Sequence, residues 1–259
     1  MTILCYHSVD PDWESPLAVH PDDFERQCAW LAQHRRVLPL AEALPRLDAS
    51  GRLPRGMAAI TIDDGFDDTH TTAWPILARH RLPSSVYLVA QTLTAAGQPV
   101  DWVDTAPPDR TLQTMSLDQV LEMQAAGVDF QSHSWAHLDL TTLSFDDCVR
   151  DLTDSRELLE DLLKRRITVL VYPRGRHNKL VQQAAARAGY AAALALPERA
   201  EKPGPFAVPR VGIHRGNTVA ALRVKSSRSY LPLRHDPRVR RAAMAARRGV
   251  SAARTRLQR

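Results

Sequence analysis

The sequence predicts an α/β fold, specifically a distorted (β/α) barrel of parallel strands, either closed or incomplete. Short apolar runs rich in β-branched residues alternate with longer segments of helical periodicity. That alternation is typical of parallel strands joined by helices. At least six such repeats fit within 259 residues, which favours a barrel over an open sheet. Polar residues gather where the apolar runs end, and in such folds function lies at the carboxyl ends of the strands.

Each expected strand is a run of about six or seven residues that is mostly apolar. Six runs of this kind follow one another along the chain, and no internal repeat or low-complexity segment interrupts them. We therefore expect strands over residues 2–7, 58–63, 84–90, 127–133, 167–173 and 190–196.

The segments between these runs carry helix signals. Pro21 and two early carboxylates open the first helix, as helix N-termini prefer. Ser116 is a good N-cap, and Gly127 is a good stop signal. A later segment has apolar residues three or four apart, which predicts an amphipathic helix. We expect helices over residues 20–34, 71–80, 116–127, 144–166 and 178–189.

Charge divides the chain into an expected catalytic domain, residues 1–220, and a basic tail, residues 221–259. The tail holds 12 Lys and Arg against Asp236 alone. Subtracting these from the totals of 34 basic and 29 acidic residues leaves 22 basic and 28 acidic residues before the tail. The net charge of +5 therefore belongs to the tail, and nucleic-acid binding is not expected of an acidic domain.

The tail over residues 238–259 has the pattern of a basic amphipathic helix. Such a helix can lie shallowly on an anionic membrane, and the alternative is a flexible, solvated tail. No apolar run is long enough to span a bilayer, no secretory signal is recognisable, and three scattered cysteines fit a reducing compartment. We expect a cytoplasmic protein held at the inner leaflet by its tail.

Two groups of polar residues indicate metal chemistry. Asp63 and Asp64 end an apolar strand, where two solvated carboxylates are not expected. His133 and His137 are four apart, so a helix starting there would place both imidazoles on one face. One carboxylate and two imidazoles can hold a divalent cation and leave positions open for water. The alternative for the histidines is a pair of partly buried polar residues.

Three short motifs carry a resemblance to a known family. They are "TIDDG" (61–65), "HSWAH" (133–137) and "YPRG" (172–175), in this order. They resemble the first three motifs of the polysaccharide deacetylases of carbohydrate esterase family 4, the NodB-homology domain. The segments "ILCYHSV" (3–9) and "FAVPRVGIHRG" (206–216) resemble a bacterial branch related to poly-N-acetylglucosamine deacetylases. The resemblance covers roughly residues 3–216.

The resemblance implies a metal-dependent hydrolase that removes the N-acetyl group from an amino sugar in glycan or glycoconjugate biosynthesis. The substrate would be an N-acetylated sugar, either lipid-linked or oligomeric. The metal ligands would be Asp64, His133 and His137, and the cation zinc, with cobalt, nickel or manganese as alternatives. Asp63 would be the catalytic base, and the backbone N–H of Arg174 would bind the oxyanion. Alternatives are a deacylase of another ester or amide, or a glycan-binding protein with a disabled site.

The chain departs from the family pattern at two points. Val171 stands where the family often has an arginine that pairs with the base. We expect Arg210 to pair with Asp63 instead, with Arg174 as the second choice. The family's usual late motif, Leu-x-x-His, is also missing in that form, and the late strand-like segment reads "RVGIHRG".

The general acid and the substrate contacts must therefore come from less characteristic positions. His214 is the candidate general acid. His7 ends the first strand and is the alternative histidine that faces the site, where the resemblance implies a supporting role near the metal pocket. We expect His7, Tyr172 and Trp102 to contact the substrate, with Trp102 offering its ring to a sugar face.

Overall fold

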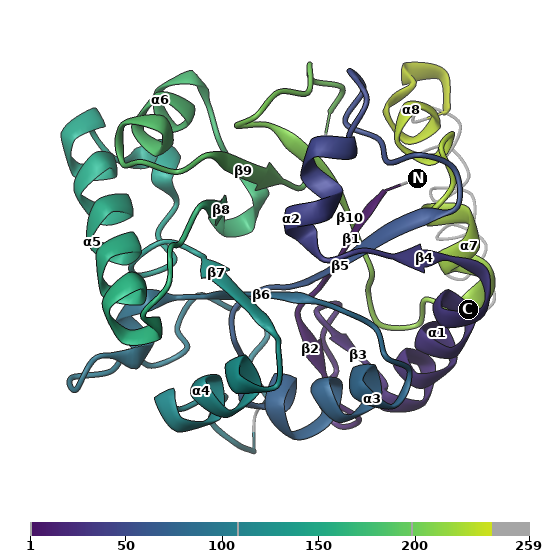
Figure 1. Ribbon diagram of the computed structural model, residues 1–259, viewed down its shortest axis with the longest axis horizontal. Coiled ribbons are helices and arrows are strands. Elements are labelled where there is room, and N and C mark those ends of the chain that lie inside the picture. The colour runs from purple at the N-terminus through teal and green to yellow at the C-terminus, as the bar shows by residue number, and fades with distance from the viewer. Residues whose placement is uncertain (1, 108, 198, 240–259) are drawn as a thin grey trace, which may run out of the picture.

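Seven parallel strands close into a barrel in the computed structural model, which describes residues 2–107, 109–197 and 199–239 (Figure 1). The order around the barrel is β1-β10-β9-β8-β7-β6-β5, and β1 also pairs with β5. The expected barrel is therefore confirmed in its closed form. The strands are β1 (Ile3–Tyr6), β5 (Met57–Ile62), β6 (Ser85–Leu88), β7 (Asp129–Ser132), β8 (Val169–Val171), β9 (Ala192–Ala195) and β10 (Val208–Gly212).

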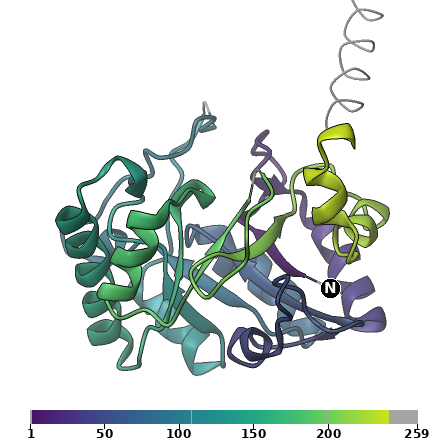
Figure 2. The ribbon, with the colours of Figure 1, turned by 90° about the horizontal axis from the view of Figure 1, so that it is seen from above.

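Helices surround the barrel, and all five expected ones form. Ser116 caps α4 through a reciprocal capping box with Gln119, and Ser144 and Asn178 cap α5 and α6. In both views α5 and α6 lie on one side of the barrel, and α1 and α7 lie on the other (Figures 1 and 2). The helices are α1 (Pro21–His34), α2 (Leu40–Ala43), α3 (Trp74–Arg79, preceded by a π-turn at Thr69–Ala73), α4 (Leu117–Ala125), α5 (Phe145–Leu163), α6 (Lys179–Arg187), α7 (Val219–Lys225) and α8 (Tyr230–His235).

Three short strands complete the sheet structure. β4 (Arg36–Val37) pairs with β5 outside the closed ring, and β2 (Ser8–Val9) pairs with β3 (Ala18–Val19) in a separate sheet. The sequence did not predict these strands, and two residues are too few to give a periodic signal.

Side chains alternate between the barrel interior and the surrounding helices, because successive residues of a strand point to opposite faces. Ile3 belongs to an inner apolar cluster that α2 closes through Leu40, whereas Leu4 packs with the outer helices. The same alternation directs inward the side chains of Cys5, Thr61, Tyr87 and Arg210. The barrel interior thus carries an apolar floor near α2 and polar groups toward the carboxyl ends of its strands.

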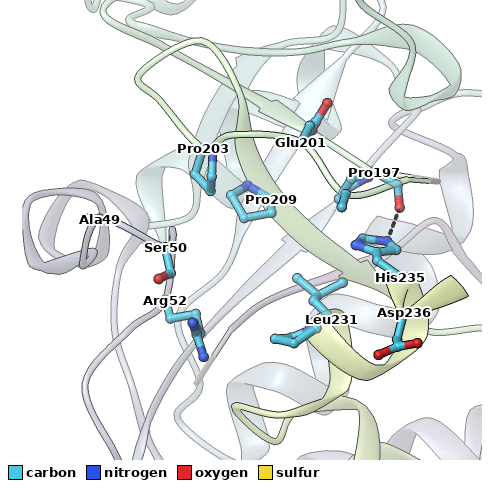
Figure 3. A pocket seen from close by; sticks show the side chains of 12 residues that line it. Ala49, Ser50, Arg52, Pro197, Glu201, Pro203, Pro209, Leu231, His235 and Asp236 are labelled. Carbon is cyan, nitrogen blue, oxygen red and sulfur yellow. Dashed lines mark hydrogen bonds between the residues drawn. The ribbon is translucent and has the colours of Figure 1, made fainter. Parts of the chain in front are cut away.

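The C-terminal helices belong to the folded body. The boundary expected at residue 220 falls inside α7, whose Leu222 is fully buried. In the α8 region, Arg228 pairs with Asp48 at 2.8 Å, and His235 Nε2 lies 3.1 Å from the carbonyl oxygen of Pro197 (Figure 3). Residues 240–259, most of the expected basic helix, lie outside the described residues. Within the described residues, no helix is long and apolar enough to span a membrane.

Candidate active site

The candidate active site lies at the carboxyl ends of neighbouring strands. Asp63 extends the β5 ladder by donating its backbone N–H to Tyr6, and His133 extends β7 by donating to Leu88. The chain then leaves the sheet at Asp64, which has a left-handed φ of 70°. Aspartate tolerates this conformation better than most residues. The two adjacent carboxylates therefore point in different directions from the end of one strand.

Asp63 is held by Arg210, which reaches it across the barrel interior from β10. The guanidinium donates two hydrogen bonds of 2.7 Å, one to each carboxylate oxygen, and a third of 2.9 Å to Thr61. Both side chains are essentially inaccessible to solvent. Burial raises the pKa of Asp63, but the charge and hydrogen bonds of Arg210 outweigh it and hold that pKa below its ordinary value.

Asp64 lies between two imidazoles. Its Oδ1 is 3.4 Å from Nε2 of His133 and 3.3 Å from Nε2 of His137, and all three residues are buried. The Nδ1–H of His133 donates to the carbonyl of Val171 at 2.9 Å, so its Nε2 faces Asp64. Burial lowers the pKa of His133, but the hydrogen bond and charge of Asp64 outweigh burial and raise that pKa. Burial lowers the pKa of His137 to about 3, so this imidazole is neutral near pH 7. Neutral imidazoles and an ionised carboxylate are the forms that bind a cation.

The donor set fits a divalent cation. The three ligand atoms lie within 4.8 Å of one another, and the set offers two nitrogens and one carboxylate oxygen. Zinc accepts this combination and keeps a fourth position for water or substrate. Asp64, His133 and His137 are therefore the residues that could hold the metal.

The two histidines meet on a turn and not on a helix, which corrects the expected local structure. Ser134 and His137 both have positive φ, at 68° and 56°. The hydroxyl of Ser134 accepts the backbone N–H of His137 at 3.1 Å, and Ser132 accepts that of Ser134 at 3.2 Å. Local hydroxyls thus build a turn where the i, i+4 spacing had predicted a helix.

Trp102 forms part of the wall around the metal ligands. Its Nε1–H donates to Asp64 Oδ1 at 3.2 Å, and its ring stacks on His137 with centroids 5.1 Å apart. Only 7% of Trp102 is exposed. One face of the Trp102 ring therefore packs against a metal-ligand candidate, and the expected sugar contact stays a prediction.

Arg174 lies in the same wall and does not pair with Asp63. Its guanidinium donates to the Trp102 carbonyl at 3.0 Å and lies 3.6 Å from Asp104. The expected pairing of Arg210 with Asp63 therefore forms, and the alternative pairing of Arg174 with Asp63 does not. Arg174 has a φ of 56°, and a Cβ on the following Gly175 would lie 2.6 Å from Leu196. The third motif thus combines a residue with a left-handed φ, Arg174, with a glycine whose position leaves no room for a Cβ.

Tyr172 is a core residue, which corrects its expected substrate contact. It is fully buried, its hydroxyl donates to the Phe206 carbonyl at 3.0 Å, and its ring stacks on His177. A side chain enclosed in this way offers no surface to a sugar.

The structure gives His7 and His214 different surroundings. His7 Nε2 lies 3.9 Å from Asp63 Oδ2, and within the described residues the Nδ1 atoms of both His7 and His214 are buried without a hydrogen-bond partner. His214 packs against Gly212, and burial together with Lys225 lowers the pKa of His214 to about 4. His7 thus lies beside Asp63, and His214 is neutral near pH 7.

Cys5 is the site residue that sequence reasoning missed. Its Sγ–H donates to Asp63 Oδ2 at 3.3 Å, and burial raises its pKa, so the thiol stays neutral. The sequence marks Cys5 only as one of three scattered cysteines. Its position two residues before His7, on the inward face of β1, was the available signal.

Comparisons with known proteins agree on the family. A family model described as Polysaccharide deacetylase matches residues 50–193, which is more than half of the chain. The chain is 25% identical over 191 residues to YxkH of Bacillus subtilis (strain 168), a protein provisionally described as a polysaccharide deacetylase. That match covers 73% of this chain and 62% of YxkH, so the chain spans under two thirds of the relative's length.

Solved structures share the fold. The deacetylase PplD of Streptococcus pyogenes, solved in complex with acetate, matches with a TM-score of 0.73 and 24% identity over 88% of this chain and 98% of that chain. IcaB from Ammonifex degensii matches with a TM-score of 0.69 and 21% identity over 87% and 96% of the respective chains. At these identities the likeness shows the fold alone. The family model therefore decides the assignment: this chain belongs to the polysaccharide deacetylase family.

Proposed function

We propose that the protein is a divalent-metal-dependent hydrolase that removes the N-acetyl group from an amino sugar of a glycan or glycoconjugate. The observation that carries the proposal is the different environment of two adjacent carboxylates. Asp63 is locked by Arg210, whereas Asp64 Oδ1 faces two imidazole nitrogens at 3.3 and 3.4 Å. One carboxylate is thus arranged for a cation and the other for proton transfer.

The residues of the chain divide the reaction among them. A divalent cation held by Asp64, His133 and His137 would polarise the acyl carbonyl and lower the pKa of an attacking water. Asp63 accepts the proton of that water, and Arg210 keeps the carboxylate ionised and oriented. The lowered pKa of Asp63 makes it a weak base, so the arrangement needs an acidified water. The backbone N–H of Arg174 is our proposed donor to the developing oxyanion.

His7 is our proposed proton donor to the departing amine. Its Nε2 lies 3.9 Å from Asp63 Oδ2, so one side-chain movement or one water can pass a proton between them. With a pKa lowered to about 4, His214 carries little proton to give at neutral pH. We expect His7→Gln to lower kcat by about 10²-fold or more, the typical contribution of a general acid, and His214→Gln to lower it much less. An equal loss in both variants would contradict this assignment.

An acetate-release assay tests the proposed function. The substrates are N-acetylglucosamine as a monosaccharide, as oligomers and in lipid-linked form, with zinc, cobalt, nickel or manganese added. We expect Asp63→Asn to keep the metal and lose about 10²–10⁴-fold in kcat, and Asp64→Ala to lose both. Asp67→Asn is the matched control, because Asp67 binds Gln119 outside the site. Full turnover by Asp63→Asn would remove Asp63 from the mechanism.

A further inference from the structure

Four arginines line a groove at the opposite end of the barrel from the candidate active site. This basic groove has a volume of about 530 Å³ and is formed by Arg35, Arg55, Arg223 and Arg228 with Gly56 and Ser227. Arg55 and Gly56 immediately precede β5, whose other end carries Asp63. A strand of this length places the groove roughly 20 Å from Asp63. The apolar hollow between Pro203, Pro209 and Leu231 is a different cavity (Figure 3).

The fold itself brings these arginines together. The backbone N–H of Arg36 donates to the Gly56 carbonyl at 2.9 Å, and β4 pairs in parallel with β5. The preceding residues, Arg35 and Arg55, therefore lie at the same end of neighbouring strands. α7 packs against α1 and adds Arg223, and the turn between α7 and α8 adds Arg228.

Positive charge in the groove exceeds the negative charge that could balance it. Arg228 pairs with Asp48 at 2.8 Å. Within the described residues, Arg35, Arg55 and Arg223 form no ion pair with a carboxylate. Burial and the nearby charge of Arg223 lower the pKa of Arg35, so this guanidinium is partly desolvated among like charges. Like charges around one groove repel one another, and a bound anion would relieve that repulsion.

Arg35 is fixed in place before any ligand arrives. Its guanidinium carbon lies 4.4 Å over the ring of Trp30, and one terminal nitrogen donates to the His34 carbonyl at 2.7 Å. Its Nε is buried and has no hydrogen-bond partner in the described residues. A guanidinium held by stacking and by one carbonyl can bind an anion through its remaining terminal donors at little entropic cost.

We propose that the basic groove binds a phosphate group carried by a phosphate monoester. Several guanidinium groups can each place two N–H donors on phosphate oxygens, and together they match its double negative charge. A lone carboxylate needs only one such partner. The ligand is either a soluble phosphoester or the headgroup of an anionic lipid, and both present the same group to the arginines. The site is separate from the candidate active site and does not depend on the proposed reaction.

Calorimetric titration of the full-length protein tests the shared chemistry, with inorganic phosphate and glycerol 3-phosphate as probes at constant ionic strength. The test variant is the double substitution Arg55→Gln and Arg223→Gln. The control, Arg81→Gln with Arg166→Gln, removes the same charge from exposed positions outside the groove. We expect the test variant to bind each probe at least about ten-fold more weakly than the control does. Equal affinity of the two variants would overturn the proposal, and this comparison also cancels phosphate bound at the metal ligands.

Vesicle flotation distinguishes the two sources of the phosphate group. The vesicles are phosphatidylcholine with or without phosphatidic acid, and both double variants keep the complete basic tail. A greater loss of phosphatidic-acid binding in the test variant than in the control identifies a lipid headgroup. Equal flotation together with weakened binding of glycerol 3-phosphate identifies a soluble phosphoester. If neither measurement separates the two variants, the groove does not bind phosphate.

Discussion

At the scale of single residues, the site shows that the arginine paired with Asp63 can come from a different strand than the family pattern uses. The family pattern places the partner of the base next to the third motif, where this chain has Val171. Here Arg210 comes from β10 and reaches Asp63 through the barrel interior. The inward-facing side chains of all the strands share one barrel interior, so an arginine missing from one strand can be replaced by an arginine on another.

Replacing Arg210 by leucine should destabilise the protein by about 3–5 kcal/mol at pH 7, because Asp63 would stay buried without its partner. The native pKa of Asp63 is lowered, so the stabilisation from this pair exists above the ordinary pKa of aspartate, near 3.9, and declines as pH falls below it. In Arg210→Leu, burial would raise the pKa of Asp63, and protonation would relieve the unpaired charge. The stability gap between the two proteins should therefore narrow between pH 7 and pH 4.

Urea unfolding at both pH values measures this gap. Arg174→Leu is the control, because Arg174 is over one third exposed and does not contact Asp63, and it should cost under about 1 kcal/mol. A gap that stays constant with pH would show that Arg210 stabilises by packing alone.

Sequence reasoning predicts residue identity at the site better than residue surroundings. Adjacent carboxylates after an apolar strand and two nearby histidines are visible as patterns, and the structure brings Asp64, His133 and His137 together. The burial of Tyr172 and the packing of Trp102 on His137 depend on Phe206 and other residues distant in the chain. Such contacts leave no local signal, so neither environment could be predicted.

At the scale of secondary-structure elements, the site is built from strained turns that follow regular strands. Asp64, Ser134, His137 and Arg174 all have positive φ, and each lies just after a strand. Such conformations persist where the surrounding structure holds them, often at functional sites. A helical spacing rule therefore found the histidine pair but assigned it the wrong local structure.

Gly175→Ala tests how firmly the turn after β8 is held. Gly175 has a φ of 67°, and an added Cβ would lie 2.6 Å from Leu196 Cβ and 2.8 Å from Leu196 N. Gly97 has a φ of 65°, and no atom of the described residues lies within 4 Å of an added Cβ, so Gly97→Ala isolates the conformational strain. We expect about 1–2 kcal/mol of destabilisation in the control and clearly more at Gly175, with lower acetate release there only. Equal destabilisation in urea unfolding would mean that the β8 turn relaxes freely.

At the scale of the whole molecule, alternation of strands and helices was enough to predict the barrel but not how it closes. Six of the seven barrel strands and five helices follow from local patterns. The seventh strand, β10, reads "VPRVG", and a proline and a glycine in five residues weaken any strand signal. The predicted domain end at residue 220 places α7 and α8 outside the folded body. It was drawn from the charge distribution, which gives no information about contacts such as that of Arg228 with Asp48.

The contribution of α8 to the folded body can be measured by truncating the chain before or after this helix. A chain ending at residue 225 loses α8 with the Arg228–Asp48 ion pair and the His235–Pro197 hydrogen bond. It also uncovers Pro209 and the hollow beside α8 (Figure 3). We expect this chain to unfold at lower urea concentration than a chain ending at residue 239, by about 1–3 kcal/mol for these contacts together. Equal stability would mean that α8 contributes nothing to the body. The chain ending at 239 is therefore the right partner for the full-length protein in testing whether residues 240–259 bind anionic vesicles, since it changes the tail and keeps the barrel.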